Sequence, residues 1–125
     1  MNELPTASSR QEVQLQDLQQ CVDQWIHEVG GGYFSVLTNT VILSEELGEL
    51  ARLSARRFGE QTFKRAEDEA RAEEDWAAEL ADVLFVLTCL ANQTGVDLTS
   101  AFEAGMHKRY TRDANRFGTS SDQRS

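Results

Sequence analysis

The stretch LSEELGEL, residues 43–50, has the spacing of an amphipathic helix but places acids where such a helix would bury apolar side chains. Its two glutamates belong to a line that advances by four, three and four residues: Ile42, Glu46, Glu49 and Leu53. Residues three and four apart share one face of a helix, and this line has the spacing of a buried stripe. The stretch therefore predicts a helix that turns two carboxylates toward the interior.

A second acidic pair repeats this pattern in ELAD, residues 79–82. Glu79 and Asp82 lie three apart, and Val86 and Cys89 continue their stripe. Two like charges about 4 Å apart repel by about 4 kcal/mol at an effective dielectric constant of 20. No basic residue lies on either stripe to offset this repulsion, and Arg52 and Arg56 on the neighbouring face are long enough to extend outward into solvent. The alternative is that both pairs face solvent and the true stripes lie one position away.

A bound cation is the remaining way to neutralise four interior carboxylates. Ligand sets made only of oxygen favour hard divalent ions, so we expect Mg²⁺, with Mn²⁺ as a substitute. The predicted ligands are Glu46, Glu49, Glu79 and Asp82. A bundle with a di-iron centre is disfavoured because the chain has no Glu-x-x-His pair.

The chain has 125 residues and a single proline, and it is predicted to fold as one all-α domain. We expect a first helix from a capping box at Ser9 and Glu12 to the glycines 30–32. A second helix runs from Val36 to Arg57 or Phe58 and stops at Gly59. The predicted architecture is a four-helix bundle, whose other two helices follow a charged connector.

That connector spans residues 60–76, and its last turns lead into a third helix that continues over 76–93. The fourth helix follows the turn 95–98, with a second capping box at Ser100 and Glu103. We expect the helical domain to span residues 9–117, with a flexible arm at 1–8 and a disordered tail at 118–125.

Composition excludes several classes of function. The chain has 21 acidic and 12 basic residues, a net charge of −9, which disfavours binding to nucleic acid or to an anionic membrane. No signal-like segment or membrane-length apolar run occurs, so we expect a cytoplasmic location. Cys21 and Cys89 lie on apolar stripes and are expected to be reduced thiols.

Other residues are candidates for binding a substrate beside the metals. Metal ions in excess of the carboxylate charge attract a polyanion, and a nucleoside triphosphate is the obvious small one. Glu45 is either a fifth ligand, the base that deprotonates a water, or a plain surface residue. A basic face toward the end of the fourth helix predicts a phosphate clamp: Lys108, Arg112 and Arg116. The same cations also suit a helix C-terminus.

Two aromatic residues follow the glycine triplet. Tyr33 and Phe34 are candidates for stacking on a nucleobase. The glycines themselves are not followed by the GK[ST] of a phosphate-binding loop, which disfavours that reading of the triplet.

The two acidic motifs together resemble those of the MazG-like all-α nucleoside triphosphate pyrophosphohydrolases. The hallmark of that family is ExxE followed by ExxD, here ELGE at 46–49 and ELAD at 79–82. The resemblance covers about residues 20–117 and looks closest to the short, single-domain members of the YpjD type. The stretches that carry it are GYFS at 32–35, EELGELAR at 45–52, DVLFVLTCLAN at 82–92, MHK at 106–108 and TRD at 111–113. The connector between the motifs is longer than is usual in the family.

The resemblance implies a helical bundle that assembles as a homodimer or homotetramer. It implies Mg²⁺-dependent hydrolysis of NTPs or dNTPs to the monophosphate and pyrophosphate, as in cleaning of the nucleotide pool. Carried over by motif, the four acids are metal ligands, and Lys108 and Arg112 match the family's basic positions. The alternative function is a non-catalytic helical module that binds a metal-nucleotide complex or a partner helix.

Overall fold

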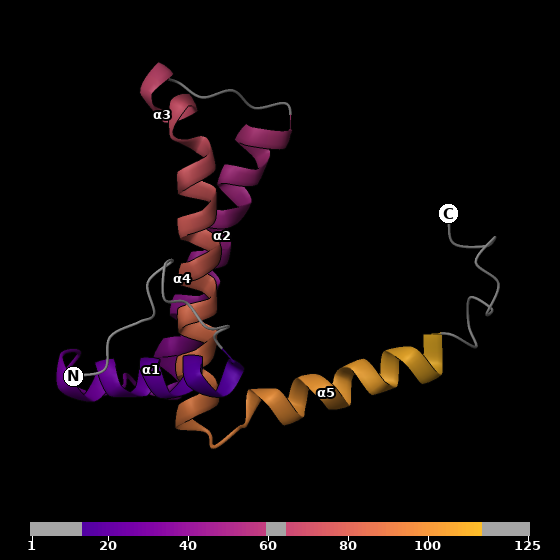
Figure 1. Ribbon diagram of the computed structural model, residues 1–125. Helices are drawn as coiled ribbons and strands as arrows, with labels where there is room; N and C mark the ends of the chain where they lie inside the picture. The colour runs from indigo at the N-terminus through magenta and orange to yellow at the C-terminus, as the bar shows by residue number, and fades with distance from the viewer. Residues whose placement is uncertain (1–13, 60–64, 114–125) are drawn as a thin grey trace, which may run out of the picture.

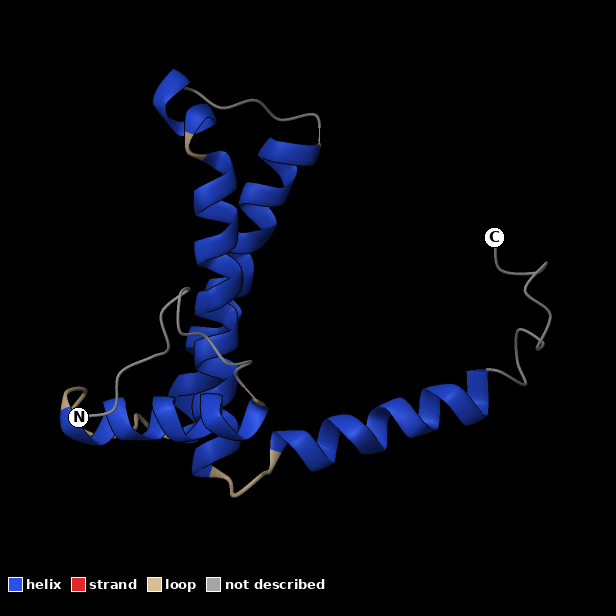
Figure 2. Cartoon of the chain, viewed as in Figure 1, coloured by secondary structure: helices blue, strands red, loops and turns tan. Residues whose placement is uncertain are grey.

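The computed structural model describes residues 14–59 and 65–113 and is helical throughout, with no strand in those two ranges (Figure 2). The elements follow in the order α1 (Leu15–Glu28), α2 (Val36–Phe58), α3 (Ala66–Ala70), α4 (Ala72–Gln93), α5 (Leu98–Lys108) and the π-helical turn η1 (Arg109–Asp113). The predicted all-α class with four long helices is confirmed. The predicted arm 1–8, the tail 118–125 and Arg116 lie outside the described residues.

Helices α2 and α4 pack along each other and form the main body of the fold, and α1 crosses their lower part (Figure 1). The buried centre joins Val22 and Ile26 of α1 to Cys89 of α4, with Leu18 and Tyr33 packed against it. Cys89 and the half-buried Cys21 are free thiols, as predicted. The centre of the core therefore lies where α1 packs against α4.

The turn between α1 and α2 depends on glycine. Gly31 and Gly32 have φ values of 79° and 102°, a region that disfavours any residue with a Cβ atom. Ser35 then caps α2 by accepting a hydrogen bond from the backbone N–H of Thr38, 3.1 Å away. The triplet therefore turns the chain from α1, which crosses the α2–α4 pair, into α2, which starts beside the end of α4 (Figure 1).

Polar side chains tie the start of α2 to the end of α4. Asn39, 6% exposed, donates from Nδ2 to Oε1 of Gln93 at 2.8 Å. Gln93 in turn donates from Nε2 to the carbonyl oxygen of Phe34 at 2.8 Å. These bonds fix the register of the two helices, since a shift of one turn would leave the buried amide of Asn39 unpaired.

Helix α5 leaves the end of α4 through a turn at Gly95 and projects sideways from the α2–α4 pair (Figure 1). It contacts α1 near its start. Phe102 and Tyr110 remain 60% and 73% exposed, respectively. Large apolar side chains of α5 and of η1 are therefore left uncovered in a single chain.

Helix boundaries can be compared with the predictions at three places. Helix α1 begins at Leu15 after the extended Gln14, and the capping box predicted at Ser9 and Glu12 lies outside the described residues. Helix α4 begins at Ala72, so the last turns of the connector lead into it as predicted, and the short α3 also forms within the connector. Helix α5 is capped by Asp97, not by Ser100, because the Asp97 carboxylate already accepts from the backbone N–H of Thr99 and from the Ser100 hydroxyl.

Across the two described ranges, no helix combines the length and the apolar character that a membrane crossing requires. Several large apolar side chains on α4 are nevertheless exposed. Leu80, Leu84 and Leu87 are 45%, 42% and 43% exposed and follow one another at helical spacing. Contiguous apolar surface of this kind commonly marks an interface.

Candidate metal and catalytic site

Three acids from the two motifs converge between α2 and α4. Glu46 of α2 and Glu79 and Asp82 of α4 each place one carboxylate oxygen within 4.8 Å of the others. The convergence follows from the helical spacing, because Glu79 and Asp82 lie less than one turn apart on the side of α4 that faces α2. The structure thus brings together three of the four acids that the sequence singled out.

Glu79 is the most constrained of the three. Its Oε2 atom is buried and has no hydrogen-bond partner in the part of the chain that the structure describes. Burial raises the pKa of Glu79, and the neighbouring Glu46 raises it further, followed by the charges of Asp82 and Glu49. The expectation of four buried acids is half right: Glu46 and Glu79 are half-buried, whereas Glu49 and Asp82 are exposed.

This donor set fits a hard divalent cation. A buried carboxylate oxygen without a partner is costly, and a cation would satisfy it. The converging atoms are all carboxylate oxygens, the ligand type that Mg²⁺ and Mn²⁺ prefer. Two helices packed side by side also hold their ligands more rigidly than loops do. The residues present therefore suit a metal of this class.

Glu49 is held by Arg52 rather than by the other acids. The Nη1 atom of Arg52 lies 3.0 Å and 2.9 Å from the two carboxylate oxygens of Glu49. The prediction that no base would neutralise the acidic motifs is therefore wrong at this position. The i,i+3 spacing on one helix is the signal that could have revealed the pair. Both side chains are about half exposed, so the pair is weak and can open.

Glu45 lies on the exposed surface of α2, beside the half-buried Glu46. It is not among the three converging acids, and its role as ligand or base stays a prediction. Its exposure leaves the carboxylate accessible to water.

The predicted phosphate clamp lies apart from these acids within one chain. Lys108 is the last residue of α5, and Arg112 lies in η1. Both side chains are exposed. The far end of α5 and η1 stand well away from the α2–α4 pair (Figure 1). These cations therefore do not meet the acids of their own chain in this arrangement.

The two candidate base-binding aromatics differ in their surroundings. The hydroxyl of Tyr33 donates to Oδ1 of Asp23 at 2.6 Å and accepts from Nδ2 of Asn92 at 3.0 Å. Burial, and then the hydrogen bond to Asp23, raise the pKa of Tyr33 to about 12. Phe34 is 64% exposed and remains open to a ligand. Stacking on a base stays a prediction for both residues.

Comparison with known proteins places these motifs in a family. The sequence matches the MazG nucleotide pyrophosphohydrolase domain over residues 34–117. It is 46% identical over 103 residues to the uncharacterized protein YpjD of Bacillus subtilis, covering 82% of this chain and 89% of that protein. The crystal structure of Bacillus subtilis YpjD is similar, with a TM-score of 0.68, 40% identity and coverage of 79% of this chain and 97% of that one.

A second solved structure is a Bacillus-conserved MazG protein, described as a nucleotide pyrophosphohydrolase. Its TM-score is 0.65 at 35% identity, with coverage of 79% of this chain and 92% of that one. The matched domain contains all four acids of the two motifs, from Glu46 to Asp82. The chain belongs to the MazG nucleotide pyrophosphohydrolase family.

Proposed function

We propose that this protein hydrolyses nucleoside or deoxynucleoside triphosphates to the monophosphate and pyrophosphate, with Mg²⁺ as its metal. The observation that carries the proposal is the convergence of Glu46, Glu79 and Asp82 in a member of this family. Cleaning of the cytoplasmic nucleotide pool is the role that fits such an activity.

The chemistry divides between the metal and the protein. A bound divalent cation would lower the pKa of a water and neutralise phosphate charge. Glu46, Glu79 and Asp82 would hold it, with Glu49 joining after release from Arg52. Glu45 would accept a proton from the attacking water while the bond between the α-phosphorus and its bridging oxygen breaks. Pyrophosphate then leaves with the bridging oxygen.

We further propose that the phosphate clamp acts on the acids of a second copy of the chain. Asp82 lies 11 residues before the end of α4, which is about 16 Å of helix. Helix α5 then carries Lys108 and Arg112 away from its own acids (Figure 1). A partner that presents its acidic site to this basic end would bring the two halves together.

Exposed apolar side chains support the same assembly. A single chain leaves four large apolar side chains exposed on two helices: Phe102 on α5, and Leu80, Leu84 and Leu87 on α4. Oligomers of one chain are commonly symmetric dimers or their multiples. A homodimer or homotetramer would bury this surface and complete the site.

The test of the function is a panel of NTPs and dNTPs, including dUTP and oxidised bases, incubated with the protein and Mg²⁺. We expect turnover of at least one nucleotide in Mg²⁺ and none in excess chelator. Tight nucleotide binding by calorimetry with no turnover across the panel would instead favour the non-catalytic binding module.

Millimolar Mg²⁺ should raise the melting temperature by about 10 °C, as expected for a ligand that binds only the folded state near 100 times its dissociation constant. The raised pKa of Glu79 means that the metal-free fold holds a proton more tightly than the unfolded chain does. This tighter proton binding stabilises the metal-free fold. The stabilisation is fully present below the ordinary carboxyl pKa and is lost as pH rises through the raised pKa of Glu79. The Mg²⁺ effect should therefore be larger at pH 7 than at pH 4.5. An unchanged melting temperature at pH 7 would contradict the metal site.

Replacing Arg52 by glutamine should tighten metal binding by up to about fivefold, because Glu49 no longer has to leave an exposed ion pair. Mn²⁺ titration followed by electron paramagnetic resonance measures the dissociation constant. Arg56→Gln is the matched control, since it removes the same charge one turn along α2. Equal tightening in both variants would mean that only net charge matters, and the competition between Arg52 and the metal would be excluded.

A further inference from the structure

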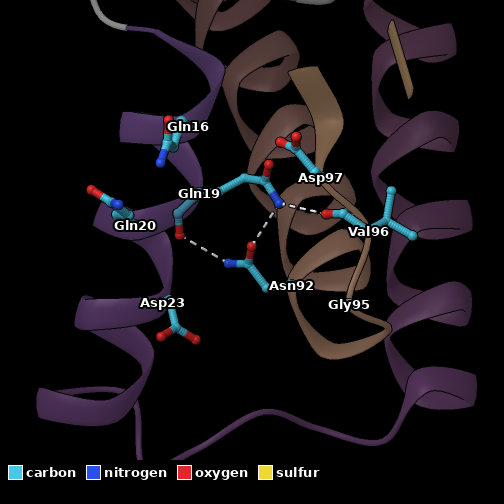
Figure 3. Close-up of a pocket in the computed structure, with 8 residues that line it drawn as sticks. All are labelled: Gln16, Gln19, Gln20, Asp23, Asn92, Gly95, Val96 and Asp97. Atoms are coloured by element: carbon cyan, nitrogen blue, oxygen red, sulfur yellow. Dashed lines mark hydrogen bonds between the residues drawn. The ribbon is translucent and has the colours of Figure 1, made fainter. Parts of the chain in front are cut away.

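A side-chain amide on α1 connects the end of α4 to the beginning of α5. Nε2 of Gln19 donates to Oδ1 of Asn92 at 3.0 Å and to the carbonyl oxygen of Val96 at 2.9 Å (Figure 3). Its Oε1 atom accepts from the backbone N–H of Leu98 at 2.9 Å. Gln19 thus holds α4, the intervening turn and the first residue of α5 with one rigid, planar group.

Asn92 fixes the amide of Gln19 in this orientation. Its Nδ2 atom donates to the carbonyl oxygen of Gln19 at 3.0 Å and to the hydroxyl of Tyr33 at 3.0 Å. Tyr33 must then donate its own proton elsewhere, and it does so to Asp23 at 2.6 Å. Each side-chain N–H or O–H in this hydrogen-bond network donates to one acceptor. The side chains can therefore satisfy the network in only one orientation.

The hydrogen bond to Leu98 is made at the first residue of α5, so it influences the direction of the whole helix. The first N–H groups of a helix have no partner within the helix, and Gln19 provides one for Leu98. Arg112 lies 14 residues further on, roughly 20 Å along the axis. A change of about 10° in the direction of α5 would move that end by roughly 4 Å. Misplacement of a binding group by 1 Å can already cost about 100-fold in rate.

We propose that Gln19 is a positioning residue: it sets the angle at which α5 leaves α4 and thereby places Lys108 and Arg112 for substrate binding. The proposal rests on the proposed function, because it assigns these cations to the phosphates. Gln19 itself touches neither the acids nor the substrate. It acts through α5 alone, so the affinity of the acidic site for metal should not depend on it.

The test compares Gln19→Ala and Gln19→Glu with Gln20→Ala. Gln20 is the neighbouring glutamine and lines the same hollow in Figure 3, yet it is exposed. Gln19→Glu keeps the acceptor for Leu98 but loses both donors, and it serves if the alanine variant does not fold. In both Gln19 variants we expect KM for the nucleotide to rise about tenfold or more. The Mn²⁺ dissociation constant should stay within about twofold of wild type. Gln20→Ala should leave both values unchanged.

Two further measurements separate positioning from a general loss of stability. In a background that carries both Lys108→Ala and Arg112→Ala, Gln19→Ala should add little to KM, because both groups that it places are already gone. Fully additive effects, or an unchanged KM in both Gln19 variants, would overturn the proposal. Amide hydrogen exchange at Leu98 needs no activity, and we expect it to accelerate about tenfold in Gln19→Ala but not in Gln20→Ala. Unchanged exchange at Leu98 would overturn the positioning role, whereas absent turnover by the wild type would count against the proposed function alone.

Discussion

Replacing Glu79 by glutamine is expected to lower kcat by about 1000-fold or more, the scale of losing several kcal/mol of metal-dependent stabilisation of the transition state. Glutamine keeps the size of the side chain but removes its charge and one carboxylate oxygen. Glu79 is the acid whose buried Oε2 atom has no partner among the described residues, so it is the ligand that the site can least replace.

The same substitution should not destabilise the metal-free protein. Glu79 lies close to Glu46 and Asp82, and the fold raises its pKa, which means that its charge opposes folding. A neutral amide removes this repulsion, so the free energy of unfolding without metal should be equal to or above that of wild type at pH 7. Urea denaturation measures this quantity. Glu73→Gln, an exposed substitution in the first turn of α4, is the matched control and should leave kcat unchanged.

Either of two outcomes would contradict this account of Glu79. Full activity in Glu79→Gln would show that the carboxylate binds no essential metal. A large loss of stability without metal would show that Glu79 makes a structural interaction that the fold requires.

Mixing equal amounts of two impaired variants should restore activity at a nucleotide concentration well below the KM of the Lys108 variant, if the clamp acts on a second copy. Glu79→Gln lacks an intact acidic site, and Lys108→Ala lacks an intact clamp. In a mixed dimer, the acids of one chain would meet the clamp of the other, which gives one complete site. Random exchange between dimers would therefore recover about a quarter of the wild-type rate. The rate is measured after the two proteins have been mixed, partly unfolded in mild denaturant and refolded together.

The control is the same mixture of Glu79→Gln with Asp82→Asn, which should stay inactive because both variants lack the acidic half. No recovery in the first mixture, while native mass spectrometry shows that mixed oligomers have formed, would mean that the clamp and acids act within one chain or that Lys108 is not the clamp.

The acidic motifs were predictable because they break a pattern. A carboxylate on a stripe flanked by Leu53, Val86 and Cys89 conflicts with the apolar helix around it, and that conflict is visible in the order of the residues at Glu46 and Glu79. The fold class followed from the same periodicity. Helix ends were less predictable, since Asp97 and Ser100 are both competent caps and only the backbone at 97 decides between them.

Other features depend on contacts between distant residues and leave no local pattern. Gln19 and Asn92 are 73 positions apart, and nothing around either residue indicates their hydrogen bond. The direction of α5 is also set by such contacts, so the sequence predicted its basic residues but not their distance from the acids. The pairing of Arg52 with Glu49 was accessible from spacing alone and was missed because the side chain of Arg52 was expected to extend outward from the neighbouring face.

The most direct test of the central claim identifies the bond that is broken. Phosphorus-31 nuclear magnetic resonance would follow the preferred nucleotide with wild-type protein in Mg²⁺, in excess chelator, and with Glu79→Gln in Mg²⁺. We expect monophosphate and pyrophosphate to appear in equal amounts in the first sample and neither product in the other two. Release of the nucleoside diphosphate with inorganic phosphate, or equal turnover in all three samples, would contradict a metal-dependent pyrophosphohydrolase built on these acids.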